Sequence, residues 1–201
     1  MTRKALVIPL LAIAVATAPA LADPLAIGSK APMTDTKLKN VNGKDVTLSD
    51  VKGAAGTLVV FTCNHCPFAK AWETRIVDLG NAYRAKGIGV IAVNANDPKA
   101  AAEDSYEMMQ QRVKDRGIQY PYVVDATSGL AKAFGATRTP EAFLFDRDGK
   151  LVYHGAIDDN AQEPDAVKAR YLKDALDAVV GGKEVAVKET KSIGCGIKFR
   201  S

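Results

Sequence analysis

The chain has 201 residues, of which 47% are hydrophobic and 25% are charged, values typical of a globular protein rather than a disordered or fibrous one. Its formal net charge of +4 is too small to indicate binding to nucleic acid or to an anionic membrane. Three cysteines are too few for a disulfide-dense miniprotein. The length fits one globular domain with a short appendage.

The first 22 residues have the pattern of a secretory signal peptide. A basic start is followed by an apolar run over 5–16 and by a small-residue cleavage pattern at Ala20-Leu21-Ala22. The run is shorter than the roughly 20 residues of a transmembrane helix, and Pro19 would disturb a continuing helix. We expect cleavage after Ala22, a periplasmic location and no membrane insertion afterwards; the alternative is an uncleaved N-terminal anchor.

The mature part alternates between strand and helix signals. It opens with a predicted hairpin over 38–48, where Asn42-Gly43 is a strong turn signal. Short apolar runs rich in β-branched residues predict strands over 57–62, 89–94, 120–125, 141–145 and 150–154. Apolar residues at helical spacing predict helices over 68–86, 99–116, 128–134 and 164–180, with Ser128 as the N-cap of the third. This order predicts an α/β protein with a central mixed sheet flanked by helices, followed by a C-terminal tail over 183–201.

Cys63 and Cys66 form a Cys-x-x-Cys between a predicted buried strand and a predicted amphipathic helix. Backbone N–H groups at a helix N-terminus are unpaired and the helix dipole is positive there, so a thiolate is stabilised and its pKa falls. The sequence therefore predicts a redox-active pair in which Cys63 attacks and Cys66 closes the disulfide. A structural disulfide is one alternative. Structural zinc is another, but it needs two further ligands, and only His65, His154 and Cys195 remain.

Three segments resemble the thioredoxin-like superfamily, specifically its redoxin branch (the alkyl hydroperoxide reductase/thiol-specific antioxidant type). They are Asn42-Gly43-Lys44, FTCNHCPF over 61–68 and TRTPEAFLFDRDGKLVYHG over 137–155. The resemblance covers about 27–182 and implies a thioredoxin-like domain over 23–182. It also implies that Thr139-Pro140 lies beside the cysteine pair with the proline in cis, and that the backbone of Thr139 pairs with an extended partner peptide.

The function that the resemblance implies is that of an exported thiol–disulfide oxidoreductase without cofactor or metal. Its substrates would be protein or small-molecule thiols and disulfides, with a thioredoxin-like redox partner and no nucleic acid. A thiol-dependent antioxidant activity stays open, because Thr62 directly precedes Cys63 and the peroxide-binding motif of peroxiredoxins is not reproduced. The buried acid of thioredoxins is also missing from the strand over 57–61, which leaves Glu73 as a candidate base on position alone.

Four further residues have two readings each. His65, between the cysteines, is expected to stabilise the thiolate and raise the redox potential, or to point to solvent. Arg138 either adds a positive electrostatic field at the cysteine pair or is a solvated surface charge. Cys195, between two glycines, is implied by the resemblance as a possible resolving thiol. If the tail folds back, we expect oxidation of the variant Cys66→Ser to give some Cys63–Cys195 bond; otherwise Cys195 is buried or capped by another molecule. His154 is expected to be structural.

The alternative function is that of a copper-handling thioredoxin-like metallochaperone. Two thiolates and a histidine suit Cu(I), which prefers soft ligands. The Cys63–Cys66 spacing is shorter than the loop of such chaperones, and His154 lacks a matching motif. The thiol–disulfide oxidoreductase is therefore the leading hypothesis.

Overall fold

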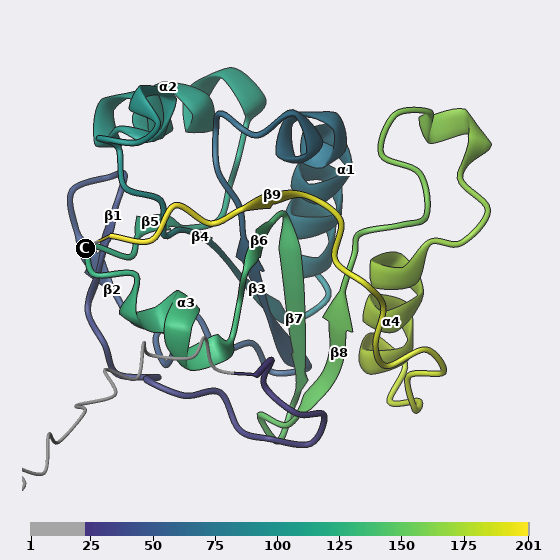
Figure 1. The fold of residues 1–201 in the computed structure, drawn as a ribbon. Helices are drawn as coiled ribbons and strands as arrows, with labels where there is room; N and C mark the ends of the chain where they lie inside the picture. Colours follow the sequence, from purple (N-terminus) through teal and green to yellow (C-terminus); the bar gives the residue numbers. More distant parts are fainter. Residues whose placement is uncertain (1–22, 201) are drawn as a thin grey trace, which may run out of the picture.

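The computed structural model describes residues 23–200, so the predicted signal peptide over 1–22 lies outside the described residues. The centre of the fold is a seven-stranded sheet in the order β2-β1-β5-β4-β3-β7-β8 (Figure 1). The strands are β1 Leu38–Asn40, β2 Asp45–Val46, β3 Gly56–Phe61, β4 Ile88–Asn94, β5 Tyr122–Val124, β7 Glu141–Asp146 and β8 Leu151–Gly155. Strands β3, β4 and β5 are parallel and the outer pairs are antiparallel, so the predicted mixed sheet is confirmed.

Helices cover both faces of the sheet. They are α1 Pro67–Arg84, α2 Tyr106–Arg116, α3 Gly129–Phe134 and α4 Tyr171–Val180, with short 3-10 helices at Ala102–Asp104 and Pro164–Ala166. Side chains of α1, α2 and α4 share one apolar cluster, whereas those of α3 pack into the other. Successive side chains of the central strands belong alternately to the two clusters, because they point to opposite faces of the sheet.

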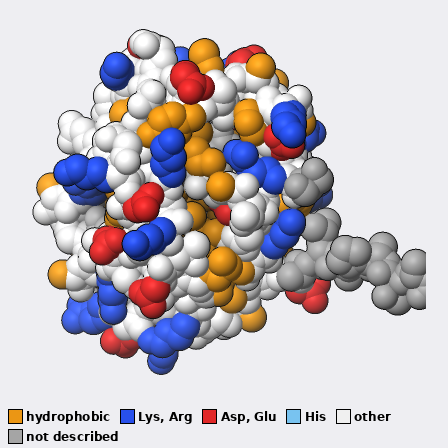
Figure 2. Space-filling view, turned by 90° about the vertical axis from the view of Figure 1, so that its left-hand side faces the viewer, with side chains coloured by type: hydrophobic (Ala, Val, Ile, Leu, Met, Phe, Trp, Pro, Cys, Tyr) orange, Lys and Arg blue, Asp and Glu red, His pale blue; other side chains and the backbone are white. Residues whose placement is uncertain are grey.

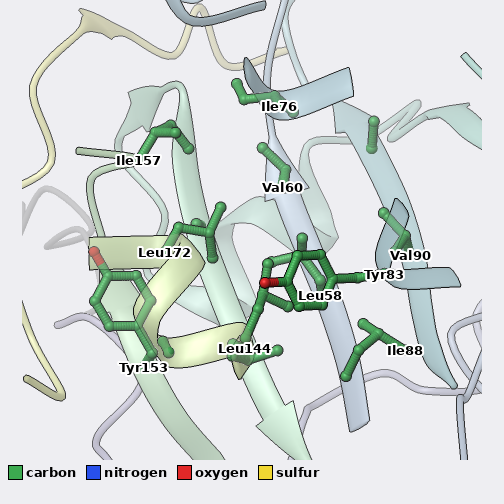
Figure 3. Packing of buried hydrophobic residues seen from close by; sticks show 14 of the residues in the cluster. Leu58, Val60, Ile76, Tyr83, Ile88, Val90, Leu144, Tyr153, Ile157 and Leu172 are labelled. Carbon is green, nitrogen blue, oxygen red and sulfur yellow. The ribbon is translucent and has the colours of Figure 1, made fainter. Parts of the chain in front are cut away.

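The larger core explains why the first predicted helix forms where it does. Figure 3 shows Ile76 and Tyr83 of α1, together with Leu172 of α4, over the same sheet face as Leu58 and Val60. The four-residue and three-residue spacing of the apolar positions in α1 keeps them on one stripe. Pro67 opens the helix, where a missing N–H costs nothing.

The predicted helix over 99–116 is interrupted. It consists of the 3-10 turn Ala102–Asp104 and the separate helix α2. Ser105 breaks the run because it is the N-cap of α2, with its hydroxyl accepting from the N–H of Met108. The break turns Asp104 inward, where it is buried. The last predicted helix is also shorter than expected, with α4 beginning only at Tyr171.

Ser128 is the N-cap residue of α3 by position, as predicted, but its side chain makes no capping hydrogen bond. Its backbone has a φ of 53°, and its hydroxyl donates to the carbonyl of Ala95 at 2.7 Å. Asp125 caps the helix instead, because its Oδ2 accepts from the N–H of Ala131 at 2.9 Å. The hairpin predicted at Asn42-Gly43 and the turn before Lys150 both form as expected.

The C-terminal segment 183–200 is docked on the domain along its length. Its residues 188–190 run beside β8, where the carbonyl of Lys188 accepts from the N–H of His154. In Figure 1 it then passes above β6 and β7 and forms β9, Cys195–Gly196, which pairs with β6, Arg138–Thr139. Ile197 is buried at the end of this path, so the tail belongs to the folded unit.

The face over the β1–β2 edge carries charges of both signs. Figure 2 shows Lys and Arg interspersed with Asp and Glu on this side, separated by small apolar areas. None of the helices within residues 23–200 is both long enough and apolar enough to cross a membrane.

Candidate active site

The two cysteines lie where the predicted strand passes into the predicted helix. Cys63 follows the end of β3, and Cys66 is the N-cap of α1. Both side chains are reduced and buried, with residue exposures of 4% and 0%. The strand is fixed between β4 and β7, and α1 is fixed by its apolar stripe, so the turn between them has little freedom.

The loop before β7 closes over this pair. The Thr139-Pro140 peptide bond is cis, as the resemblance implied. The Oγ1 of Thr139 lies 3.0 Å from the Sγ of Cys63, and the carbonyl of Thr139 accepts from the thiol of Cys66 at 3.2 Å. The structure therefore brings together Cys63, Cys66 and the Thr139-Pro140 loop, which are far apart in the sequence.

The two thiols share a hydrogen bond, which moves their pKa values in opposite directions. The pKa of Cys63 is raised by its hydrogen bond with Cys66, then by burial, and further by the charge of Asp104. The pKa of Cys66 is lowered to about 4 by the hydrogen bond from Cys63, and donors at Cys195 and Ala69 add to the effect. The Ala69 donor is one of the first-turn N–H groups of α1, which have no partner within the helix.

His65 does not point freely to solvent. Its Nδ1 lies 2.6 Å from the Oδ2 of Asp104, and its side chain is 22% exposed. The side chain of Asp104 is 0% exposed, and it also accepts from the backbone N–H of Asn64 at 2.6 Å and from the amide of Asn96 at 2.8 Å. Two of these three hydrogen bonds hold the turn between the cysteines, at Asn64 and His65, and the third connects Asp104 to Asn96.

Sequence reasoning missed the network around Asp104. The hydroxyl of Tyr122 donates to the side-chain oxygen of Asn64 at 3.0 Å, which extends the network into the core. Asn94 is the last residue of the buried strand β4, and Asn96 lies two residues beyond it. Such polar residues at the C-terminal end of a parallel strand are a recognisable signal for a site.

Glu73 lies near the cysteines but is held by arginines. Its carboxylate forms ion pairs with the Nε of Arg112 at 2.5 Å and the Nε of Arg116 at 2.7 Å. It shares with Cys63 and Tyr122 the lining of a small cavity of about 20 Å³. That volume accommodates one water molecule, through which a carboxylate exchanges protons with a thiol. The assignment of Glu73 as the base stays a prediction.

Glu141 holds the loop that carries Thr139. Its Oε2 accepts from the backbone N–H groups of Thr137 and Arg138 at 2.8 and 3.0 Å, and its Oε1 lies 2.7 Å from the Nε2 of His154. The ring of His154 also stacks on Phe143 with a centroid distance of 4.3 Å. His154 thus has the structural surroundings expected for it, and the distal histidine of the copper hypothesis is paired with Glu141.

One group of side chains in the described range 23–200 has the arrangement of a metal site. The ligand atoms of Cys63, His65 and Asp104 all lie within 4.8 Å of one another. The Nδ1 of His65 and the Oδ2 of Asp104 are already hydrogen-bonded to each other, so a metal ion would replace that bond. Arg138 lies outside this group, and its Nη1 donates to the carbonyl of Gly194 at 3.0 Å.

The comparison with family models decides the classification. Residues 27–154 match the model described as the AhpC/TSA family. The chain belongs to this family. The match begins before the first hairpin and ends in β8, so it includes the cysteine turn and the cis-proline loop of this AhpC/TSA protein.

Individual relatives agree with this assignment. The thiol-disulfide oxidoreductase ResA of Geobacillus thermodenitrificans is 28% identical over 127 residues, which are 63% of this chain and 67% of the relative. An uncharacterised protein of Geobacillus kaustophilus is 40% identical with a TM-score of 0.81, over 87% of this chain and 93% of the other. A protein of Neisseria meningitidis provisionally assigned as a thioredoxin is 26% identical with a TM-score of 0.54, over 72% and 86%. The fold is therefore thioredoxin-like.

We expect that replacing His65 by leucine makes the cysteine pair more reducing. The charge of Asp104 raises the pKa of Cys63, and the variant leaves this carboxylate without its imidazole partner. A shift of about 30 mV in the glutathione redox equilibrium would correspond to about 1.4 kcal/mol. Lys70→Gln is the control, because Lys70 pairs with Glu103 instead of Asp104. Equal shifts in both variants would mean that the contact between His65 and Asp104 has no specific role.

A second prediction concerns the stability of the Thr139 loop in acid. Burial raises the pKa of Glu141, but hydrogen bonds from His154, Arg138 and Thr137 outweigh it and hold the pKa below its usual value of 4.5. A carboxyl group with a lowered pKa stabilises the fold above its unfolded pKa, and this stabilisation disappears as the pH falls through the folded value. The difference in unfolding free energy between the wild type and Glu141→Gln should therefore shrink below about pH 4.5. Urea denaturation at several pH values measures it. The exposed Glu163→Gln should show a constant difference; a constant difference for Glu141→Gln as well would contradict the prediction.

Proposed function

We propose that the mature chain is an exported thiol–disulfide oxidoreductase that acts through Cys63 and Cys66. The observation that carries the proposal is the contact of both thiols with Thr139, the residue before the cis-proline, at the N-terminus of α1. The relationship to ResA supports the same reaction class. The substrates are disulfides and thiols of proteins or small molecules, and a thioredoxin-like protein is the expected redox partner.

Two exchange steps complete the reaction in the direction of substrate reduction. The sulfur of Cys63, after losing its proton, attacks a substrate disulfide, so that a mixed disulfide forms and one substrate thiolate leaves. The sulfur of Cys66 then attacks that of Cys63, which releases the second substrate thiolate and leaves a Cys63–Cys66 disulfide. In the mixed disulfide Cys63 has no proton to donate, but the N–H groups of Cys195 and Ala69 still favour the attacking Cys66 thiolate.

Two measurements on the mature chain test this proposal. The chain should catalyse the reduction of insulin by dithiothreitol, and its Cys63–Cys66 pair should equilibrate with glutathione at a defined potential. That potential distinguishes an oxidant from a reductant. A protein that forms the disulfide but exchanges it no faster than a model dithiol would refute the proposed activity.

Export is tested separately by expressing the full chain in a bacterium and sequencing the product. We expect a periplasmic protein that starts at Asp23. A product that retains Met1 and sediments with the membrane would support the uncleaved anchor instead.

The antioxidant activity is the narrower part of the proposal. Peroxide would oxidise the Cys63 thiolate to a sulfenic acid with release of water or alcohol, and Cys66 would then condense with it to give the disulfide and a second water. Thiol-dependent peroxide consumption by the mature chain is the test.

A further inference from the structure

The backbone edge of Thr139, where the resemblance places partner peptides, is occupied by the chain itself. Strand β9 pairs antiparallel with β6, with Cys195 opposite Thr139 and Gly196 opposite Arg138. The N–H of Ile197 continues the ladder to the carbonyl of Thr137 at 2.9 Å. An extended peptide from the tail therefore has the position that β-augmentation gives to a bound partner.

The chain is shaped for this occupant. A Cβ atom on Gly194 would lie 2.1 Å from the carbonyl oxygen of Thr139, so only glycine permits the tail to approach so closely. The carbonyl of Gly194 also accepts from Arg138. Beyond β9, the carbonyl of Lys198 accepts from Asp97 at 2.7 Å and its N–H donates to Asn96 at 2.7 Å. The tail is thus tied to the network that positions Asp104.

The structure brings Cys195 to Cys66, whereas the predicted Cys63–Cys195 bond concerns the variant Cys66→Ser. The N–H of Cys195 donates to the Sγ of Cys66 at 3.4 Å, and the two thiols are hydrogen-bonded. Cys195 packs against the cluster formed by Cys63, Cys66 and Ala69. The docked tail thus places a third thiol in contact with the sulfur that the Cys63–Cys66 disulfide would contain.

We propose that Cys195 is a third exchange thiol, which takes over the disulfide from Cys63–Cys66 by forming a Cys66–Cys195 bond. The tail then acts as a built-in substrate peptide, and the oxidised protein presents a free Cys63. This inference rests on the proposed function, because it needs an oxidised Cys63–Cys66 pair as its starting state.

The step is an exchange without net oxidation. The thiol of Cys195 gives its proton to solvent, and its sulfur attacks the Sγ of Cys66. The Cys66–Cys195 bond forms, the Cys63–Cys66 bond breaks, and Cys63 leaves as a thiolate that takes up a proton. In the reduced protein, burial and the neighbouring Cys66 raise the pKa of Cys195 to about 11, while Lys198 and Arg138 lower it. Oxidation of Cys66 removes the opposing thiolate, so the attacking form becomes easier to reach.

Disulfide mapping of the mature chain tests the proposal. The protein is oxidised with glutathione disulfide, quenched in acid, alkylated and digested with trypsin. Cys63 and Cys66 share the peptide over 53–70, and Cys195 lies in the peptide over 192–198. We expect these two peptides to be linked, and fragmentation should place the alkyl group on Cys63.

Two glycine variants provide a matched pair. Gly194→Ala should lift the tail, whereas a Cβ on Gly196 would have only the carbonyl of Thr137 nearby, at 4.0 Å. We expect the fraction of Cys66–Cys195 to fall about tenfold in Gly194→Ala, because overpacking against backbone opposes docking, and to stay unchanged in Gly196→Ala. Circular dichroism checks that both variants fold. If Gly194→Ala does not fold, disulfide mapping of the wild type alone decides whether the Cys66–Cys195 bond forms.

Three results would overturn the inference while leaving the proposed function intact. They are a Cys63–Cys66 disulfide with Cys195 fully alkylated, a Cys63–Cys195 link, and a Cys195–Cys195 dimer on a non-reducing gel, each accompanied by normal insulin reduction. The proposed function would fail in a different way: Cys63 and Cys66 would form no disulfide that exchanges with other thiols. An equal Cys66–Cys195 fraction in the two glycine variants would refute the role of the docked tail.

Discussion

Replacing Cys63 by serine is expected to abolish insulin reduction, whereas replacing Cys66 should accumulate mixed disulfides. Without Cys63, the chain lacks the sulfur that receives the substrate, because Cys66 lies at 0% exposure beneath the tail. Without Cys66, the mixed disulfide at Cys63 loses the thiolate that resolves it. Mass spectrometry after incubation with a disulfide-bonded peptide measures both effects.

The control for these substitutions is Cys195→Ser, which keeps Cys63 and Cys66 and should still form their disulfide. If Cys63→Ser accumulates the mixed disulfide and Cys66→Ser does not, the roles of the two cysteines are reversed. That outcome would agree with the low pKa of Cys66 as the attacking group. The experiment thus distinguishes the order of the two thiols in the reaction.

Asp104→Ala should reduce both stability and activity, although Asp104 lies outside the Cys-x-x-Cys motif. The substitution leaves the buried N–H of Asn64 and the amide of Asn96 without their acceptor. Unsatisfied buried donors cost about 1–3 kcal/mol each, so we expect the free energy of unfolding to fall by about 3 kcal/mol. Urea denaturation measures this loss, and the redox potential of the variant reports the freed His65.

Glu103→Ala is the matched control for Asp104→Ala. Glu103 is the neighbouring acid, but its side chain is exposed and pairs with Lys70 at the surface. We expect this variant to have the stability and potential of the wild type within error. Equal losses in the two variants would show that the 3-10 turn as a whole, and not the carboxylate of Asp104, is what the site requires.

Local patterns in the sequence were sufficient for the elements of the fold. The spacing of Trp72, Ile76 and Tyr83 predicts one buried helical face, and the structure confirms it. Asn42-Gly43 predicts the first hairpin, because the turn requires backbone angles that these residues adopt easily. The cysteine turn was likewise predictable, since strand, cysteines, Pro67 and helix are contiguous in the chain.

Predictions failed where a polar side chain had two possible partners. Ser128 is a good cap by residue type, but its hydroxyl bonds to Ala95 and Asp125 caps the helix. The helix over 99–116 reads as continuous in the sequence, yet Asp104 turns inward to the cysteine turn. Such choices depend on which acceptor the folded chain brings near, and local propensity contains no information on that.

The sequence by itself determined the mixed α/β order, the cysteine pair at a helix start and the proline loop that belongs beside it. Only the tertiary structure decided that both cysteines contact Thr139, that Asp104 contacts His65, and that Cys195 lies against Cys66. The first group depends on residues that are neighbours along the chain or follow a regular period. The second depends on contacts between distant segments, since hydrogen bonds and charges act over a few ångströms in space whatever the separation in sequence.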